Sequence, residues 1–166
     1  MDFIQLGLGR WLHIMAGVMW IGLLYYFNFV QVPALAAAGK DGTGGGITKH
    51  VAPRALLYFR WAAVVTWLAG ATILGKNFLD AFLFLNTRYV PIGVGAWLGT
   101  IMLFNVWVLI WPNQQKILGL KPASDDEKAR ARRVAFLASR TNTMLSMPML
   151  FFMIASGGTF RTAFFG

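Results

Sequence analysis

Two side chains that could ligate a metal stand inside apolar stretches of the sequence: His13 in RWLHIMAGVMWIG and Met153 in PMLFFMIAS. An imidazole and a thioether form one of the axial pairs of haem iron, and both also suit copper. The other histidine, His50, precedes a different stretch, so a pair of histidines at one membrane depth is not expected. We expect a neutral His13 ring, hydrogen-bonded to a backbone carbonyl or to a polar group near Ser156, with no metal bound. A haem b or copper ligand and a proton carrier are the alternatives.

Eight further polar side chains collect toward one end of the apolar stretches. They are Asn28, His50, Arg60, Asn105, Asn113, Gln114, Arg140 and Asn142. Hydrocarbon offers a polar group no partner, so such side chains bond to one another or to the backbone. All six acidic residues stand in loops or at the terminus, so the set has no carboxylate base. We interpret it as a structural network in which Asn105 bonds to Asn142 or Arg140, with an anion or substrate site as the alternative.

The elements that position these residues are long apolar helices. Of the 166 residues, 57% are hydrophobic and 13% are charged, and the mean hydropathy is +0.58. Four windows, 11–32, 55–75, 92–111 and 143–160, come close to or exceed the roughly 20 residues that a membrane-spanning helix needs. The sequence therefore predicts one all-α domain over 1–166, an integral membrane four-helix bundle.

The net charge is +9, and the basic residues are distributed as in a membrane protein rather than as in a nucleic-acid-binding protein. Ten of the fifteen lysines and arginines fall in the two segments that join the first window to the second and the third to the fourth. Four fall on the opposite side, and Arg60 lies inside a window. The positive-inside rule then places both termini outside the cytoplasm and directs the basic segments toward anionic lipids.

The two basic segments have different local signals. Residues 36–54 contain five glycines, which predicts an irregular, mobile loop. Ser124 followed three residues later by Glu127 is a capping box. It predicts a cytoplasmic amphipathic helix ahead of the fourth membrane window.

Segments from all four windows resemble a known family. RWLHIMAGVMWIGLLYYFNFVQVP, IWPNQQKILG and SRTNTMLSMPMLFFMIAS, with HVAPRALLYFRWAAVVTWLAG between them, are similar to the membrane-embedded N-terminal domain of the bacterial cytochrome c-linked urate oxidase (urate hydroxylase). The resemblance implies a bacterial inner-membrane domain that oxidises urate and passes electrons to a cytochrome c domain outside the cytoplasm. We expect a shortened version without the cytochrome c domain. The sequence has no cysteine, hence no Cys-x-x-Cys-His, and reads Ser156, Gly157, Gly158 where we would expect a histidine.

Two functions fit these observations. The first is an accessory or structural subunit of a larger membrane redox or energy-converting complex, with lipid and other membrane subunits as partners and no resident cofactor. The second is a redox module that binds haem or copper through His13 and Met153 and oxidises urate or a related small substrate.

Overall fold

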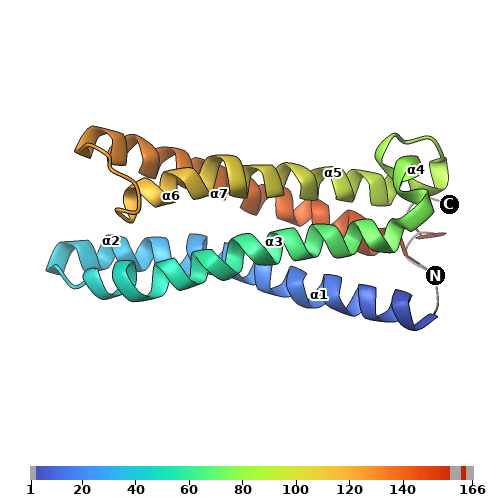
Figure 1. Ribbon diagram of the computed structural model, residues 1–166, viewed down its shortest axis with the longest axis horizontal. Helices are drawn as coiled ribbons and strands as arrows, with labels where there is room; N and C mark the ends of the chain where they lie inside the picture. The colour runs from blue at the N-terminus through green and yellow to red at the C-terminus, as the bar shows by residue number, and fades with distance from the viewer. Residues whose placement is uncertain (1–2, 158–161, 164–166) are drawn as a thin grey trace.

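The computed structural model describes residues 3–157 and 162–163, and every regular element in these ranges is helical (Figure 1). Four long rods make up the molecule. Rod 1 is α1 (Phe3–Tyr25), the π-helical segment η1 (Tyr26–Gln31) and α2 (Val32–Asp41); rod 2 is the π-helical η2 (Ile47–Val51) and α3 (Ala52–Leu74). Rod 3 is α5 (Val90–Phe104), the π-helical η5 (Asn105–Ile110) and α6 (Trp111–Ile117); rod 4 is the single helix α7 (Asp125–Ala155). The all-α prediction is confirmed for these residues.

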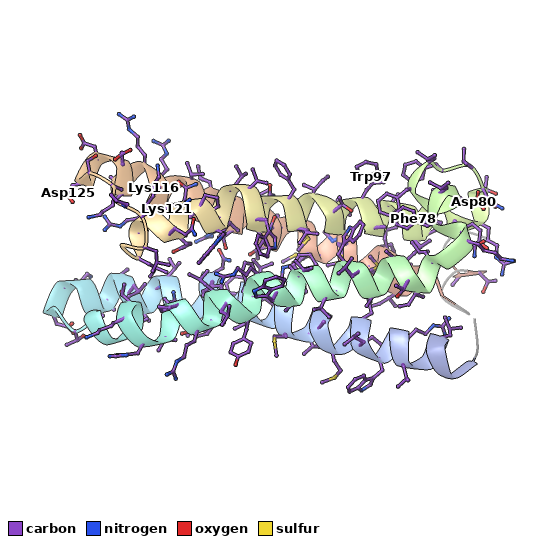
Figure 2. The ribbon with its side chains drawn as sticks, in the orientation of Figure 1. Phe78, Asp80, Trp97, Lys116, Lys121 and Asp125 are labelled. Atoms are coloured by element: carbon purple, nitrogen blue, oxygen red, sulfur yellow. The ribbon has the colours of Figure 1, made fainter. Side chains whose placement is uncertain are left out.

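Short turns and a small helix connect the second rod to the third. They are η3 (Gly75–Asn77), α4 (Phe78–Phe82) and η4 (Thr87–Tyr89). Helix α4 packs so closely on α5 that a Cβ atom added at Gly93 would collide with the backbone oxygen of Ala81. Trp97 Nε1 adds a hydrogen bond of 2.9 Å to the carbonyl of Phe82. Figure 2 shows Phe78, Asp80 and Trp97 together at this end of the bundle, which we name the α4 end.

Prolines and glycines account for several helix limits. Helices α2, α3, α5 and α6 each carry a proline in the first turn, where a missing N–H costs no intrahelical bond. Gly42 and Gly119 follow α2 and the turn after α6 with φ of 75° and 74°, a left-handed conformation that glycine adopts readily. Prolines thus mark the starts of these four helices, and the two glycines mark the turns that follow α2 and α6.

Three stretches are long and apolar enough to cross a membrane: Leu6–Asp41, Ile47–Phe82 and Thr87–Ile117. They contain the first three predicted windows. Among the described residues α7 does not join them, and its predicted window 143–160 runs into positions outside those residues. Membrane crossing by the fourth rod stays a prediction.

Two sequence-based expectations about the connecting segments are wrong. Residues 36–54 are helical except around the turn at 42–44, because the alanines of α2 favour helix and Asp41 closes the turn with Thr43. The helix that starts at the capping box is not a separate amphipathic helix. It continues without interruption as α7, through Pro148, to Ala155.

The rods pack as two pairs. Helix α1 lies along α3, and α5 with α6 lies along α7. Between the pairs runs a core whose largest fully buried side chains include Phe59, Leu24, Met102 and Val106. At the other end of the bundle, which we name the α6 end, lie Lys116, Lys121 and Asp125 (Figure 2).

Candidate functional site

His13 lies at the contact between α1 and α3. Its Nδ1 is 2.8 Å from the backbone oxygen of Thr66. A carbonyl oxygen only accepts hydrogen bonds, so Nδ1 carries a proton and donates it; in the neutral ring that we expect, Nε2 then keeps its lone pair. The ring fits because position 70 is glycine: a Cβ there would stand 2.9 Å from His13 Cε1.

The hydrogen-bond partner of His13 is of a predicted type, but it lies on a helix that was not predicted. The partner is a backbone carbonyl, as expected, but it belongs to α3 instead of the end of α7. Ser156 uses its hydroxyl locally, donating to the carbonyl of Met153 at 2.8 Å. The helical period identifies which face of α1 is buried, whereas the helix that covers this face depends on packing.

Met153 packs toward rod 3. A Cβ atom added at Gly95 on α5 would lie 3.4 Å from the Met153 methyl carbon. Gly95 therefore lets α5 approach α7 closely, as small residues do between membrane helices. His13 and Met153 thus each pack against a different helix, and their pairing as haem or copper ligands stays a prediction.

Asn105 and Asn142 form a buried polar contact between rods 3 and 4. Asn105 Nδ2 donates to Asn142 Oδ1 at 2.8 Å, and Asn142 Nδ2 donates to the backbone oxygen of Met102 at 2.9 Å. Asn142 has no exposed surface. The prediction that these two amides bond across helices is confirmed, and the bonds join the two helices of the second pair.

Asn28 joins the first pair to the second. In the π-helical segment η1, its Nδ2 donates to Ser139 Oγ on α7 at 2.7 Å and to the carbonyl of Leu24 at 2.9 Å. One helical turn earlier, the Tyr25 hydroxyl lies 2.9 Å from Ser146 Oγ. These contacts tie α1 and η1 to α7.

Arg60 also bridges the pairs, from α3 to α6. Its guanidinium lies 3.7 Å from the centre of the Trp111 ring, a cation–π contact. The indole N–H of Trp107 donates to the backbone oxygen of Arg60 at 3.3 Å. Arg60 is half-buried, so this contact combines charge with aromatic packing.

The remaining predicted residues have separate environments. Asn113 donates to the carbonyl of Leu109 in its own helix at 2.7 Å, and Gln114 is half-buried. His50 and Arg140 are exposed, and the Arg140 guanidinium lies 5.0 Å from the Phe136 ring. The structure therefore joins Asn105 to Asn142 and gives Asn28, Arg60 and Asn113 partners outside the predicted set.

Sequence reasoning missed the aromatic donors. Trp67 Nε1 donates to Thr100 Oγ1 at 2.9 Å between α3 and α5. The signal was present, because an indole N–H buried in an apolar segment needs an acceptor. Two buried polar atoms, Trp20 Nε1 and Gln31 Oε1, have no hydrogen-bond partner in the part of the chain that the structure describes.

No group of three or more histidine or acidic side chains that could hold a metal occurs within residues 3–157 and 162–163. Among those described residues, His13 presents an imidazole nitrogen that its own hydrogen bond leaves available. A ligating histidine commonly donates its other ring N–H to a backbone carbonyl. The Nδ1 contact of His13 has this form.

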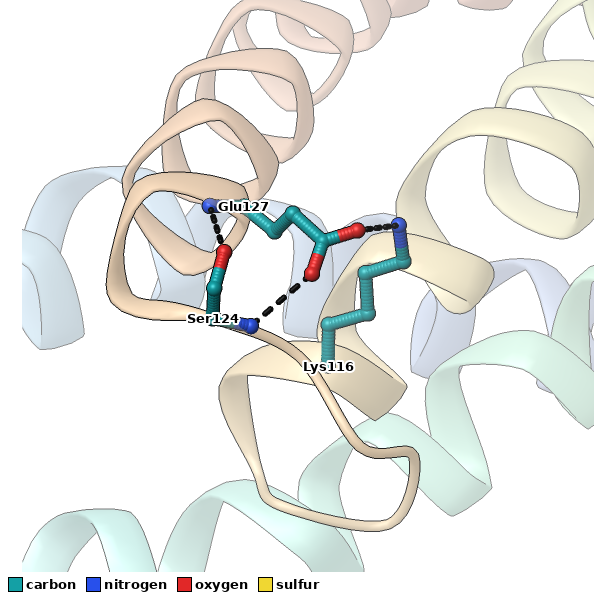
Figure 3. Close-up of polar contacts among 3 residues, drawn as sticks. All are labelled: Lys116, Ser124 and Glu127. Carbon is teal, nitrogen blue, oxygen red and sulfur yellow. Dashed lines mark hydrogen bonds and ion pairs between the residues drawn. The ribbon is translucent and has the colours of Figure 1, made fainter.

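The capping box is present at the start of α7 (Figure 3). The Ser124 hydroxyl accepts from the N–H of Glu127 at 3.2 Å, and the Glu127 carboxylate accepts from the N–H of Ser124 at 2.8 Å. Lys116 Nζ lies 4.0 Å from the other carboxylate oxygen. The hydrogen bonds with Ser124 and then the charge of Lys116 hold the pKa of Glu127 below its ordinary value.

Comparison with known proteins gives a match at the level of a family. A family model described as "Urate oxidase N-terminal" matches residues 78–163, slightly more than half of the chain. The matched segment begins at α4 and includes rods 3 and 4, and so contains Asn105, Asn142 and Met153. Among curated proteins and among solved structures, nothing matches.

Proposed function

We propose that this chain, which belongs to the urate oxidase N-terminal family, is an accessory or structural subunit of a larger membrane redox or energy-converting complex. The observation that carries this proposal is the use of the buried amides. Asn142 uses both ends of its amide, and Asn28 donates to two partners. Amides engaged in this way hold helices together.

The outer surface supports the same proposal. Large apolar side chains stay exposed along rods 1 and 2, among them Trp11 at 60%, Val18 at 64% and Trp61 at 52%. In a bilayer such side chains contact lipid tails or the apolar helix of a partner. We place the protein in the bacterial inner membrane, with both termini outside and the basic α6 end against anionic lipids of the cytoplasmic leaflet.

Native extraction tests the proposal. The tagged full chain is taken from its own membranes with a polymer that keeps the surrounding lipid, and its size and companions are determined. We expect a particle larger than the chain alone that carries a redox subunit. Recovery of the chain only by itself, or only with copies of itself, contradicts the subunit role. A reporter fused after Gly166 that is active in the cytoplasm contradicts the orientation.

The second function, a redox module, is favoured by the available Nε2 of His13. His13 and Met153 would be the residues that hold haem b or copper, and the bound group would supply one-electron transfer in the oxidation of urate or a related substrate. The hydrogen bond to the Thr66 carbonyl and the space at Gly70 orient the imidazole of His13. Absorption spectra and metal analysis of the purified chain, with His13→Phe as control, decide this. A haem or copper signal that His13→Phe removes establishes the second function.

A further inference from the structure

A cavity of about 520 Å³ opens at the α4 end of the bundle. This volume lies within the roughly 300–1,000 Å³ of small-molecule sites. Its lining comes from Arg10 on α1, Leu74 on α3, Arg88, Tyr89 and Ile92 at η4 and the start of α5, the residues around Ser156 after α7, and Thr162. The cavity is therefore made by the assembled bundle and not by one helix.

Two guanidinium groups give the cavity its chemistry. Arg10 and Arg88 come from rods 1 and 3 and line the same space. Among the described lining residues none is acidic, and neither arginine forms an ion pair with a described residue. At the α6 end, by contrast, Lys116 and Lys128 pair with Glu127 and Asp125. The two arginines thus line the cavity with no ion-pair partner among the described residues.

The other lining groups suit a ligand with an anionic head and an apolar body. Tyr89 and Ile92 belong to the turn that begins α5, and the N-terminus of a helix favours negative charge. The Tyr89 hydroxyl adds a hydrogen-bond donor, whereas Leu74 and Ile92 supply apolar wall. A guanidinium recognises the oxygens of a carboxylate or phosphate group, often through two parallel hydrogen bonds.

We propose that this cavity binds an amphiphilic oxyanion, a carboxylate or phosphate joined to an apolar group, between Arg10 and Arg88. The oxyanion is either the phosphate of a lipid headgroup or a free organic anion. This site is separate from His13 and from the amide network, and it does not depend on the function proposed above.

The test uses the full chain in nanodiscs and the midpoint of thermal unfolding, which a ligand of the folded state raises. One arm adds phenyl phosphate or benzoate to discs of phosphatidylcholine. The other arm replaces part of that lipid with phosphatidylglycerol. A rise in the first arm identifies a free anion as the ligand, and a rise in the second identifies a headgroup.

The variants locate the binding. Arg10→Gln and Arg88→Gln each remove a charged hydrogen-bond donor and should weaken binding about tenfold. Lys76→Gln removes a positive charge in η3, outside the cavity lining, and should leave binding unchanged. Arg88→Lys keeps the charge without the forked geometry and should weaken binding less than Arg88→Gln.

The unfolding midpoint of each variant without added anion shows whether it folds. If Arg88→Gln does not fold, Arg10→Gln and Arg88→Lys carry the comparison. No rise of the wild-type midpoint in either arm overturns the proposal. An equal loss of binding in Lys76→Gln and in the arginine variants also overturns it, because the effect then reflects overall charge.

Discussion

The two helix pairs are held by hydrogen bonds of similar form but different completeness. In the first pair, His13 on α1 donates to the carbonyl of Thr66 on α3; in the second, Asn142 on α7 donates to the carbonyl of Met102 on α5. Asn142 also accepts from Asn105, so both ends of its amide are engaged. The imidazole of His13 has only one of its nitrogens in a described hydrogen bond.

The side chains that form the two bonds also differ in how deeply they are buried. Asn142 is fully buried, whereas His13 is half-buried and fits against Gly70. A satisfied buried amide fixes the position of two helices and offers nothing further. A half-buried imidazole with one ring nitrogen outside any described hydrogen bond fixes helices and also keeps a possible ligand atom. The polar contact of the second pair is therefore structural, whereas the contact of the first pair leaves one imidazole nitrogen of His13 that could bind a ligand.

The largest loss of stability should come from removing the hydrogen bonds of Asn142. Asn142→Leu removes two interhelical hydrogen bonds, which in membrane bundles contribute about 0.6 kcal/mol each on average and up to about 1.7. We expect the free energy of unfolding in detergent micelles to fall by about 1–3 kcal/mol. Asn113→Leu, which loses one bond within its own helix, is the matched control. An Asn142→Leu protein as stable as Asn113→Leu would show that the network does not hold the second pair.

The first pair should be more sensitive to shape than to bonding. Gly70→Ala places a methyl group against the His13 ring, which must turn away from Thr66. Crowding costs about 1–3 kcal/mol, and the better helix propensity of alanine returns up to about 1 kcal/mol. Gly22→Ala, where no atom lies within 4 Å of the new group, should be neutral or stabilising. Equal stability of the two variants, measured by the same unfolding assay, would refute the fitted His13 ring.

The smallest effect on stability should come from Glu127, in the capping box at the start of α7. The pKa of Glu127 is lowered in the folded chain, so its contribution is complete above the ordinary glutamate pKa of about 4.3. It is lost as the pH falls through the lower folded value. We expect weaker protection of the amides in the first turn of α7 at acid pH, measured as hydrogen exchange relative to the intrinsic rate at the same pH. Glu127→Gln keeps an acceptor but does not titrate; if its first turn shows the same pH dependence as wild type, Glu127 is not the group responsible.

Much of the fold follows from composition and local chemistry. The first three apolar windows lie inside the helices that could cross a membrane, and the capping box at Ser124 begins α7 as predicted. Asn105 and Asn142 were identifiable because a buried amide in an apolar helix needs a partner. Each of these inferences depends on a single residue or on residues close in sequence.

The pairing of helices did not follow from the sequence. Helices that are apolar on all sides have no polar face to indicate orientation, so the neighbour of α1 could not be inferred. It is set by shape across distant segments, as at His13 and Gly70. The glycines at 42–46 misled because glycine permits a turn without preventing helix on either side.

The unbroken course of α7 has a mechanical consequence. At 1.5 Å per residue, its 31 residues make a shaft roughly 46 Å long, with charged turns at one extremity and Asn142 and Ser146 further along. Because one hydrogen-bonded backbone joins them, a tilt or rotation imposed at Asp125 is carried along the shaft to the amide of Asn142. Force applied to the exposed end of the molecule therefore reaches the bonds that hold its interior.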